Sequence, residues 1–235
     1  IDLSNPSLMH LFYAPEITKS CLEYTLTEEE SKHCVRVLRL KQGSKVELLN
    51  GKGLSAIAEI DDDHPKKCRL RILTSEFYPP AKQEIHLALA PTKNMDRLEW
   101  LVEKATEIGL NKLSFLKCDH NERGQLKLDR LEKIAISAMK QSKRYYLPEI
   151  SEIIPFKAFV EEHPDGYIGH CYPATKLELA ELSESKVFLI GPEGDFSENE
   201  VSIALQNGYQ AVSLSDFRLR TETAALISVM KLSLI

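Results

Sequence analysis

Two short segments of the chain combine residue types that bind ligands with the position of a loop after a buried strand. The first, IGPEGDFS at residues 190–197, holds two glycines, a proline and two carboxylates. Glycine lets a backbone approach a ligand closely, and proline stiffens a loop. The carboxylates would repel a phosphate, and the chain has neither a GxGxxG nor a Walker-type fingerprint. The segment therefore favours a ligand with hydroxyl groups, an amine or a positive centre. The alternative is a solvated turn before a capped helix.

The second segment, RLRTETAA at residues 218–225, places two arginines where a helix is expected to begin. The first backbone N–H groups of a helix have no partner within the helix and are free to bind a ligand. Guanidinium groups beside them can stabilise negative charge that develops in a reaction. The alternative is a purely structural helix start, in which Glu222 complements the helix dipole.

The elements that must position these segments alternate between strand and helix. Short apolar runs predict the strands, and apolar residues at three- and four-residue steps predict the helices. The expected strands lie at residues 84–90, 113–118, 166–171, 186–191 and 210–214, and the expected helices at 94–110, 129–146, 197–208 and 221–232. This alternation predicts an α/β domain with a mostly parallel sheet covered on both faces.

Ligands of such sheets bind at the carboxyl ends of the strands. Three expected strand ends carry unusual residues, at 168–176, 190–197 and 213–224. These three segments are therefore the candidates for a binding site.

The first part of the chain is different, because it is β-rich with one helix. Residues 27–39 predict the helix, since acidic residues come first and basic residues follow, as a helix dipole favours. Residues 45–60 predict a hairpin around a turn with two glycines, and residues 68–73 predict a further strand.

A proline-marked stretch at residues 78–83 predicts a linker. The expected domains are therefore residues 9–78 and residues 82–235. Met9 is the expected natural start, so residues 1–8 are left out of the predicted fold.

Composition and charge are typical of a globular protein of a reducing compartment. The five cysteines are odd in number, widely spaced and without a CxxC pair, which argues against disulfides and a zinc site. No membrane-spanning run and no signal peptide are recognised, so the expected location is cytoplasmic, with no membrane partner and no metal. The net charge is −5, but residues 117–147 carry eight basic and four acidic side chains. A polyanion could therefore bind locally.

The two segments, together with DRLEWLVEKATEIGL and SAMKQSKRYYLPEI, resemble the ribosomal RNA small subunit methyltransferase E family of the SPOUT superfamily. The resemblance runs from Met9 to the last helix, and GPEG and LRTETA in this order are highly specific together. It implies an N-terminal PUA-like β-barrel domain and a C-terminal α/β domain with a deep trefoil knot. It also implies a homodimer and S-adenosyl-L-methionine as cofactor. The implied reaction is methylation of N3 of a uridine in 16S rRNA of the small ribosomal subunit.

The resemblance also implies which residues hold the cofactor, from three loops. They are Gly169, His170, Gly191, Pro192, Glu193, Gly194, Ser213, Leu214, Ser215, Leu219, Arg220, Thr221 and Thr223. The chain departs from the family at two positions, because many members have glycine in place of Asp195 and of Ser215.

For the reaction, we expect Arg220, with Arg218, to stabilise negative charge on the uracil carbonyls, because N3 must lose its proton. Glu193 and Glu222 are the candidate bases or orienting acceptors. Two alternatives stay open: a ribose 2′-O-methyltransferase of the same superfamily, and a non-catalytic RNA-binding protein that retains the fold.

Basic side chains are the expected RNA contacts, and His33, Arg36 and Arg39 recur at three-residue steps, hence roughly on one helix face. The alternative for any one of them is a solvated charged face. The remaining candidates are Lys41, Lys52, Arg123, Lys140, Lys143 and Arg144.

Overall fold

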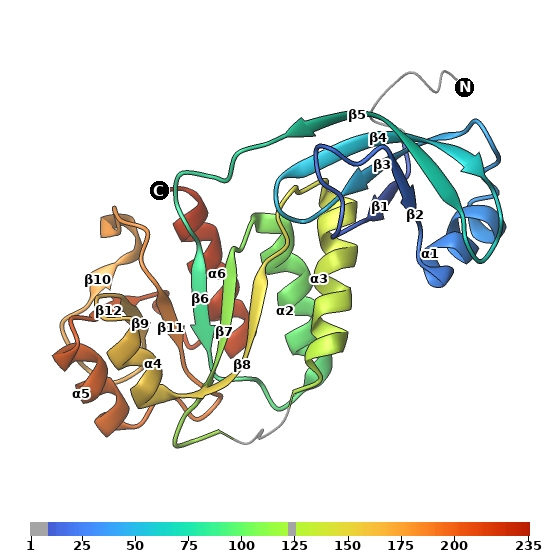
Figure 1. Ribbon diagram of the computed structural model, residues 1–235. Helices are drawn as coiled ribbons and strands as arrows, with labels where there is room; N and C mark the ends of the chain where they lie inside the picture. The colour runs from blue at the N-terminus through green and yellow to red at the C-terminus, as the bar shows by residue number, and fades with distance from the viewer. Residues whose placement is uncertain (1–8, 122–125) are drawn as a thin grey trace. The chain divides into compact units, whose positions relative to one another are not determined.

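The computed structural model describes residues 9–121 and 126–235 and divides into two compact units, each described separately below (Figure 1). The N-terminal unit contains the described residues up to Pro80 together with Met139–Leu147. The C-terminal unit contains Ala81–Ala138 and Pro148–Ile235. The sequence predicted one linker at residues 78–83, with everything after it in the second domain. It did not predict that residues 139–147 would belong to the first unit.

The N-terminal unit is built around a curled five-stranded sheet in the order β1-β3-β4-β5-β2. β1 runs parallel to β3, and the other pairs are antiparallel. The expected hairpin is confirmed, and its turn holds Gly51 and Gly53 at φ values of +71° and +91°. Glycine adopts such angles without steric cost. The strands are β1 (Leu11–Tyr13), β2 (Glu23–Thr25), β3 (Lys45–Leu49), β4 (Leu54–Asp62) and β5 (Arg69–Phe77).

The helical segment of this unit differs from the expected single helix. α1 (Glu28–Lys32) is followed by a π-helical turn, His33–Val37, in which the carbonyl of His33 accepts the N–H of Leu38, five residues on. The wider turn changes the direction of successive side chains, so a three-residue step no longer keeps residues on one face. Arg39 lies beyond the helix at a φ of +57°. The prediction that His33, Arg36 and Arg39 share one face of a regular helix is therefore wrong.

The C-terminal unit is built around a seven-stranded sheet in the order β10-β12-β9-β11-β6-β7-β8. Every pair in it is parallel. The α/β class with a parallel sheet is therefore confirmed, and the trefoil knot stays a prediction. The strands are β6 (His86–Leu89), β7 (Lys112–Lys117), β8 (Glu149–Pro155), β9 (Tyr167–Gly169), β10 (Leu177–Glu178), β11 (Phe188–Ile190) and β12 (Gln210–Ser213).

Helices cover both faces of this sheet (Figure 1). On one face, α4 and α5 close a core in which Phe159 and Ala204 are fully buried against Leu189 of the sheet. On the other face, α2 and α6 pack against each other, and α6 contacts β6 and β11. The helices are α2 (Met95–Ile108), α3 (Leu128–Ser142), α4 (Phe156–Glu162), a 3-10 turn (Leu179–Glu181), α5 (Glu198–Gln206) and α6 (Thr221–Ser233). The end of α3, from Met139 on, belongs to the N-terminal unit.

The helix ends follow the sequence signals. Asn94 caps α2 by accepting the N–H of Asp96, and α2 ends at Gly109, which has a φ of +114°. At α5, Ser197 and Glu200 form the expected capping box, in which each side chain accepts the other residue's backbone N–H. α5 therefore begins at a fixed point directly after the GPEGD loop.

Candidate active site

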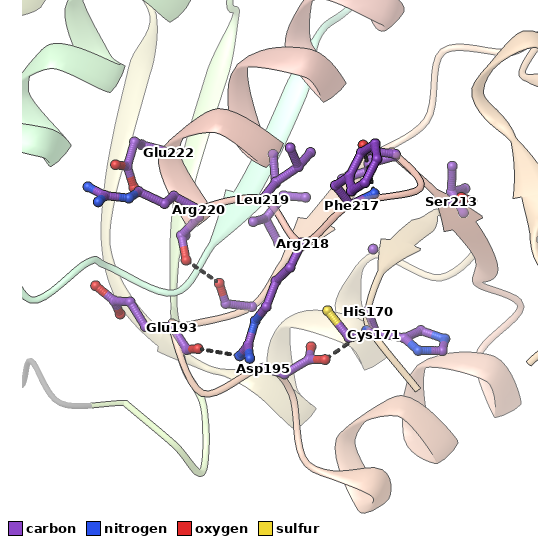
Figure 2. Close-up of a pocket in the computed structure, with 18 of the residues that line it drawn as sticks. His170, Cys171, Glu193, Asp195, Ser213, Phe217, Arg218, Leu219, Arg220 and Glu222 are labelled. Atoms are coloured by element: carbon purple, nitrogen blue, oxygen red, sulfur yellow. Dashed lines mark hydrogen bonds between the residues drawn. The ribbon is translucent and has the colours of Figure 1, made fainter. Parts of the chain in front are cut away.

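A cavity of about 630 Å³ lies in the C-terminal unit, at the carboxyl ends of β9, β11 and β12 (Figure 2). These strands are neighbours in the order β12-β9-β11, and all run the same way. Their following loops must therefore meet at one edge of the sheet. This is the physical reason why three segments far apart in sequence line one cavity.

Most of the expected cofactor residues line the cavity. Gly194 and Thr223 do not line it, and both are exposed. Their assignment therefore stays a prediction without support from the cavity. The expected residues that line it are Gly169, His170, Gly191, Pro192, Glu193, Ser213, Leu214, Ser215, Leu219, Arg220 and Thr221.

The GPEGD loop, residues 191–195, is held at two points by hydrogen bonds. Gly191 is buried, and a Cβ there would lie 3.0 Å from the backbone N of Phe196, so any larger residue would push the turn apart. Thr221 donates its hydroxyl to the carbonyl of Gly191 at 3.3 Å. Further along, the Glu193 carboxylate accepts the backbone N–H of Lys93 at 3.1 Å. The loop is therefore fixed to α6 and to the segment before α2.

Asp195 connects this loop to the loop after β9. Its φ is +67°, in the left-handed region that favours glycine. One carboxylate oxygen accepts the N–H of Cys171 at 2.7 Å, and the other accepts the N–H of Phe196 at 2.8 Å. Its own carbonyl lies 3.0 Å from Nδ1 of His120. Aspartate is therefore strained at this φ, but its carboxylate forms two hydrogen bonds that glycine could not form.

His170 is a buried polar residue of the site, as are Thr221 and Glu222. Only 8% of His170 is exposed, and within the described residues neither ring nitrogen has a hydrogen-bond partner. Burial, with a smaller effect of the Lys176 charge, lowers the pKa of His170. The ammonium of Lys176 donates to the carbonyl of His170 at 2.6 Å. A neutral imidazole with unused nitrogens is thus placed beside the cavity.

The two arginines of the RLRTETAA segment differ in their hydrogen bonding. Nη2 of Arg218 donates to the carbonyl of Glu193 at 3.3 Å, and Figure 2 shows its side chain running towards that loop. Among the described residues, no hydrogen bond or ion pair to the guanidinium of Arg220 is found. Arg220 is the N-cap residue of α6, and no side chain caps that helix. An exposed cation and uncapped N–H groups therefore share one edge of the cavity.

Arg97 is a cavity residue that the sequence reasoning missed. It comes from the first turn of α2, and its Nε lies 3.6 Å from Oε1 of Glu222. The Glu222 side chain is only 10% exposed, whereas that of Arg97 is 38% exposed. Arg97 stands within one of the motifs quoted for the family resemblance, and that was the available signal. The pair fixes Glu222 next to a positive charge.

The candidate RNA contacts that the structure describes belong to the N-terminal unit. His33, Arg36, Arg39, Lys41, Lys52, Lys143 and Arg144 are exposed. Lys140 is half-buried and pairs with Glu30 at 2.8 Å, which makes it the least accessible of the set. Arg123 lies outside the described residues. None of the described members of this set is among the residues that line the cavity.

The neighbouring tyrosines are used internally. Tyr145 stacks on Tyr78 with ring centroids 3.7 Å apart, and the hydroxyl of Tyr146 donates to the carbonyl of Tyr78 at 2.8 Å. In the described parts of the chain, no group of three or more histidines, cysteines or carboxylates that could hold a metal ion is found. None of the described helices is long and apolar enough to cross a membrane.

Comparison with known proteins places this cavity in a family. Residues 79–233 match the model of an RNA methyltransferase domain, and residues 26–73 match that of an RNA methyltransferase PUA domain. Ribosomal RNA small subunit methyltransferase E of Aquifex aeolicus is 29% identical over 94% of this chain and 99% of its own length. The chain belongs to the ribosomal RNA small subunit methyltransferase E family. It is an RNA methyltransferase, and the resemblance read from its motifs is confirmed.

Solved structures agree with this membership. The crystal structure of a probable rRNA-methyltransferase from Porphyromonas gingivalis is 35% identical, with a TM-score of 0.85 over 94% of this chain and 95% of that one. A ribosomal RNA small subunit methyltransferase E from Neisseria gonorrhoeae, bound to S-adenosyl methionine, is 27% identical, with a TM-score of 0.82 over the same shares. The SPOUT-type fold of the C-terminal unit and the PUA-like N-terminal sheet are therefore confirmed for this family member.

Proposed function

We propose that the protein transfers a methyl group from S-adenosyl-L-methionine to N3 of a uridine in 16S rRNA of the small ribosomal subunit. The observation that carries the proposal is the single cavity framed by the loops after β9, β11 and β12. A protein of the same family from Neisseria gonorrhoeae has been solved bound to S-adenosyl methionine. The proposal assigns the same cofactor to this cavity.

The residues present fit such a cofactor. The unpartnered ring nitrogens of His170 can accept or donate hydrogen bonds to a polar ligand. Glu193, Asp195 and Glu222 give the cavity carboxylates that attract an ammonium and a sulfonium. When bound, S-adenosyl-L-methionine supplies a methyl group on a positively charged sulfur. Donors, acceptors and negative charge are therefore available from this chain.

The chemical task of the chain is to favour the uracil anion, because N3 carries a proton that must leave. We assign this task to Arg220, whose guanidinium can stabilise negative charge on the two uracil carbonyls. Arg218 is already bonded to the carbonyl of Glu193, so its main role is to hold the loop and add positive charge. The two arginines thus divide positioning and charge stabilisation.

The two carboxylates, Glu222 and Glu193, also have different roles, one in positioning and one in accepting a proton. Glu222 is buried against Arg97 and is suited to orient that arginine. Glu193 is exposed at the cavity, and within the described residues only one of its carboxylate oxygens is in a hydrogen bond, with Lys93. Since a carboxylate accepts several hydrogen bonds, Glu193 is the better placed of the two to receive the N3 proton, directly or through water.

The remaining parts of the proposal concern partners. We propose that the exposed basic residues of the N-terminal unit contact rRNA phosphates, which position the substrate without reading its sequence. We also propose a homodimer in the cytoplasm, as the family resemblance implies. Salt dependence of RNA binding would report the phosphate contacts, and sedimentation would report the dimer.

The test uses methyl-labelled S-adenosyl-L-methionine with unmethylated small ribosomal subunits and, separately, with naked 16S rRNA, followed by nucleoside analysis. Label in 3-methyluridine is the expected result, and the preferred substrate then shows at which stage of assembly the enzyme acts. Label in a nuclease-resistant, ribose-methylated nucleotide would replace the proposal with 2′-O-methylation. Absence of label from both substrates, with a folded protein that binds RNA, would overturn it.

A further inference from the structure

Phe217 is the most exposed of the large apolar side chains that line the cavity. Its exposed fraction is 82%, although burying a phenylalanine ring stabilises a protein by roughly 1.5–3 kcal/mol. Figure 2 shows the ring on the loop from Ser213 to Leu219, from which the Arg218 side chain runs away towards Glu193. A ring that is left in solvent at the rim of a site has no role in packing the core.

The chemistry around the ring is that of a nucleobase site. Phe217 is the only phenylalanine, tyrosine or tryptophan among the described residues that line the cavity. Lys176, Arg218 and Arg220 line the same cavity. An aromatic face and cations within one site are a combination with which proteins hold single-stranded or extruded bases.

The loop is shaped so that the ring stays at the rim. The hydroxyl of Ser215 accepts the backbone N–H of Phe217 at 3.1 Å, which closes a short turn. Ser215 is not among the described residues with a positive φ, so this turn needs no glycine. The serine at this position therefore organises the segment that carries the ring.

The proposed reaction creates a need for such a ring. N3 lies on the pairing edge of uracil, so the base must leave any pair and any stack before N3 can react. A base that has left its stack loses the contacts of both its faces. Arg220 can act on the edge of the base. Two aromatic rings line the described cavity, and Phe217, at 82% exposed, presents its face to an incoming base, whereas His170 is only 8% exposed.

We infer that Phe217 is the platform on which the target uracil stacks, an assignment that rests on the proposed function. The other occupant to consider is a second copy of the chain, which would bury the ring in a subunit interface. Ser215, Asp216 and Arg218 around it are polar and exposed, so the ring stands alone rather than in an apolar patch. The core of a subunit interface is an apolar patch with few charges. The polar, charged residues around Phe217 therefore fit a nucleobase better than a second subunit.

The kinetic test compares Phe217→Ala, Phe217→Leu and Phe217→Trp with the wild-type enzyme. Stacking on an aromatic ring corresponds to about a 5- to 150-fold change in affinity for the base. We expect the alanine and leucine variants to raise KM for RNA within this range, with an unchanged dissociation constant for S-adenosyl-L-methionine. The tryptophan variant should restore the wild-type KM. If the leucine variant has the same KM for RNA as the wild type, the inference is overturned, because stacking needs a flat ring and leucine has none.

Leu205→Ala is the matched control, since Leu205 is a 46% exposed apolar residue on α5 away from the cavity. It should leave both constants unchanged. Sedimentation of Phe217→Ala tests the other occupant: a lower oligomeric state than the wild type would overturn the inference. An unchanged state, together with the raised KM, supports it.

A binding experiment separates this inference from the proposed function. In a Trp100→Phe background, Phe217→Trp introduces the single indole of the protein, because Trp100 is the only tryptophan of the chain. A uridine-containing oligonucleotide, added with S-adenosylhomocysteine, should quench its fluorescence even if no methyl group is ever transferred. Fluorescence that stays unchanged while the oligonucleotide binds would overturn the inference. Failure of methyl transfer by the wild type would instead contradict the proposed function.

Discussion

The carboxylate of Asp195 accepts the backbone N–H of Cys171 at 2.7 Å, which joins the loop after β11 to the loop after β9. The same residue has a φ of +67°, which a glycine would adopt more easily. Backbone strain that persists beside a cavity suggests a role in shaping it. The bond to Cys171 is therefore the feature that distinguishes aspartate from glycine here.

Replacing Asp195 should weaken cofactor binding more than it weakens the fold. Asp195→Gly removes two hydrogen bonds to a charged group but also relieves strain of roughly 1 kcal/mol, so the melting temperature should change little. The dissociation constant for S-adenosyl-L-methionine should rise about tenfold, because the two loops lose their link. Calorimetric titration and thermal unfolding measure the two effects.

Asp195→Asn separates charge from shape. Asparagine tolerates the left-handed φ, but its amide nitrogen cannot accept an N–H, so one of the two bonds to Cys171 and Phe196 is lost. It should also weaken cofactor binding, with Glu198→Gln on α5 as the control that does not. Wild-type affinity in both Asp195 variants would show that the link between loops has no part in binding.

Arg220→Ala should lower kcat about 10²- to 10³-fold with little change in cofactor affinity, because a donor that stabilises developing charge acts mainly in the transition state. Arg218→Ala should affect cofactor and RNA constants together, since its side chain holds the Glu193 loop. Lys157→Ala is the surface control, on α4. The effects are measured as single-turnover rates at saturating cofactor. If Arg220→Ala loses rate and cofactor affinity by the same factor, Arg220 does not stabilise charge in the transition state.

The Arg97–Glu222 pair should respond asymmetrically to loss of either partner. Arg97→Met leaves a carboxylate that is only 10% exposed without its cation, which should cost about 1–3 kcal/mol of stability. Glu222→Gln leaves a cation that is 38% exposed and hydrated, and should cost less than about 1 kcal/mol. Urea unfolding of both variants and of the double variant tests this, with the double variant closer to Glu222→Gln than to the sum. A simple sum of the two costs would mean that the side chains do not interact.

Glu222→Gln also tests which carboxylate is the base. If Glu222 only positions Arg97, the pH dependence of kcat should keep its shape in this variant. Glu193→Gln should instead remove the part of the profile that reports deprotonation of the base. A profile that flattens in Glu222→Gln and persists in Glu193→Gln would reverse the assignment.

His86 should make the protein sensitive to acid. Burial, with smaller effects of His163 and Lys112, lowers the pKa of His86 to about 4, and its ring lies 2.9 Å from the hydroxyl of Ser114. The unfolded chain takes up this proton near pH 6.5, whereas the folded protein resists it until about pH 4. The free energy of unfolding should therefore fall as pH drops from 6.5 to 4, by on the order of 3 kcal/mol from this group.

His86→Gln keeps a hydrogen-bonding group towards Ser114 without titrating in this range. Its stability should therefore depend less on pH than that of the wild type between pH 6.5 and 4. Urea unfolding at several pH values measures the difference. Parallel pH dependences of the two proteins would show that His86 does not contribute.

Local signals were sufficient for many elements. The Asn94 cap and the Gly109 stop bound α2, and Ser197 with Glu200 begins α5, because caps depend on residues within one turn. Residues 149–155 and 156–162, which form β8 and α4, were not expected. β8 is half polar, so its strand form comes from pairing with β7 rather than from a local pattern. The buried residues Phe156, Phe159 and Val160 of α4 do recur at three- and four-residue steps, but the helix is only 7 residues long. No hydrophobic periodicity in the sequence predicted the π-helical turn at His33–Val37 either.

For the candidate site, the amino-acid sequence determined the chemical groups: two glycine-bearing loops, two arginines and the carboxylates beside them. It also determined the family, because two motifs in order are specific when neither is alone. Only the tertiary structure decided that Arg97 faces Glu222, that Asp195 bonds to Cys171 and that Arg218 is engaged by Glu193. The reason is that these contacts join residues on different loops and helices. Parallel strand pairing brings such segments together, and no local pattern records which side chains then meet.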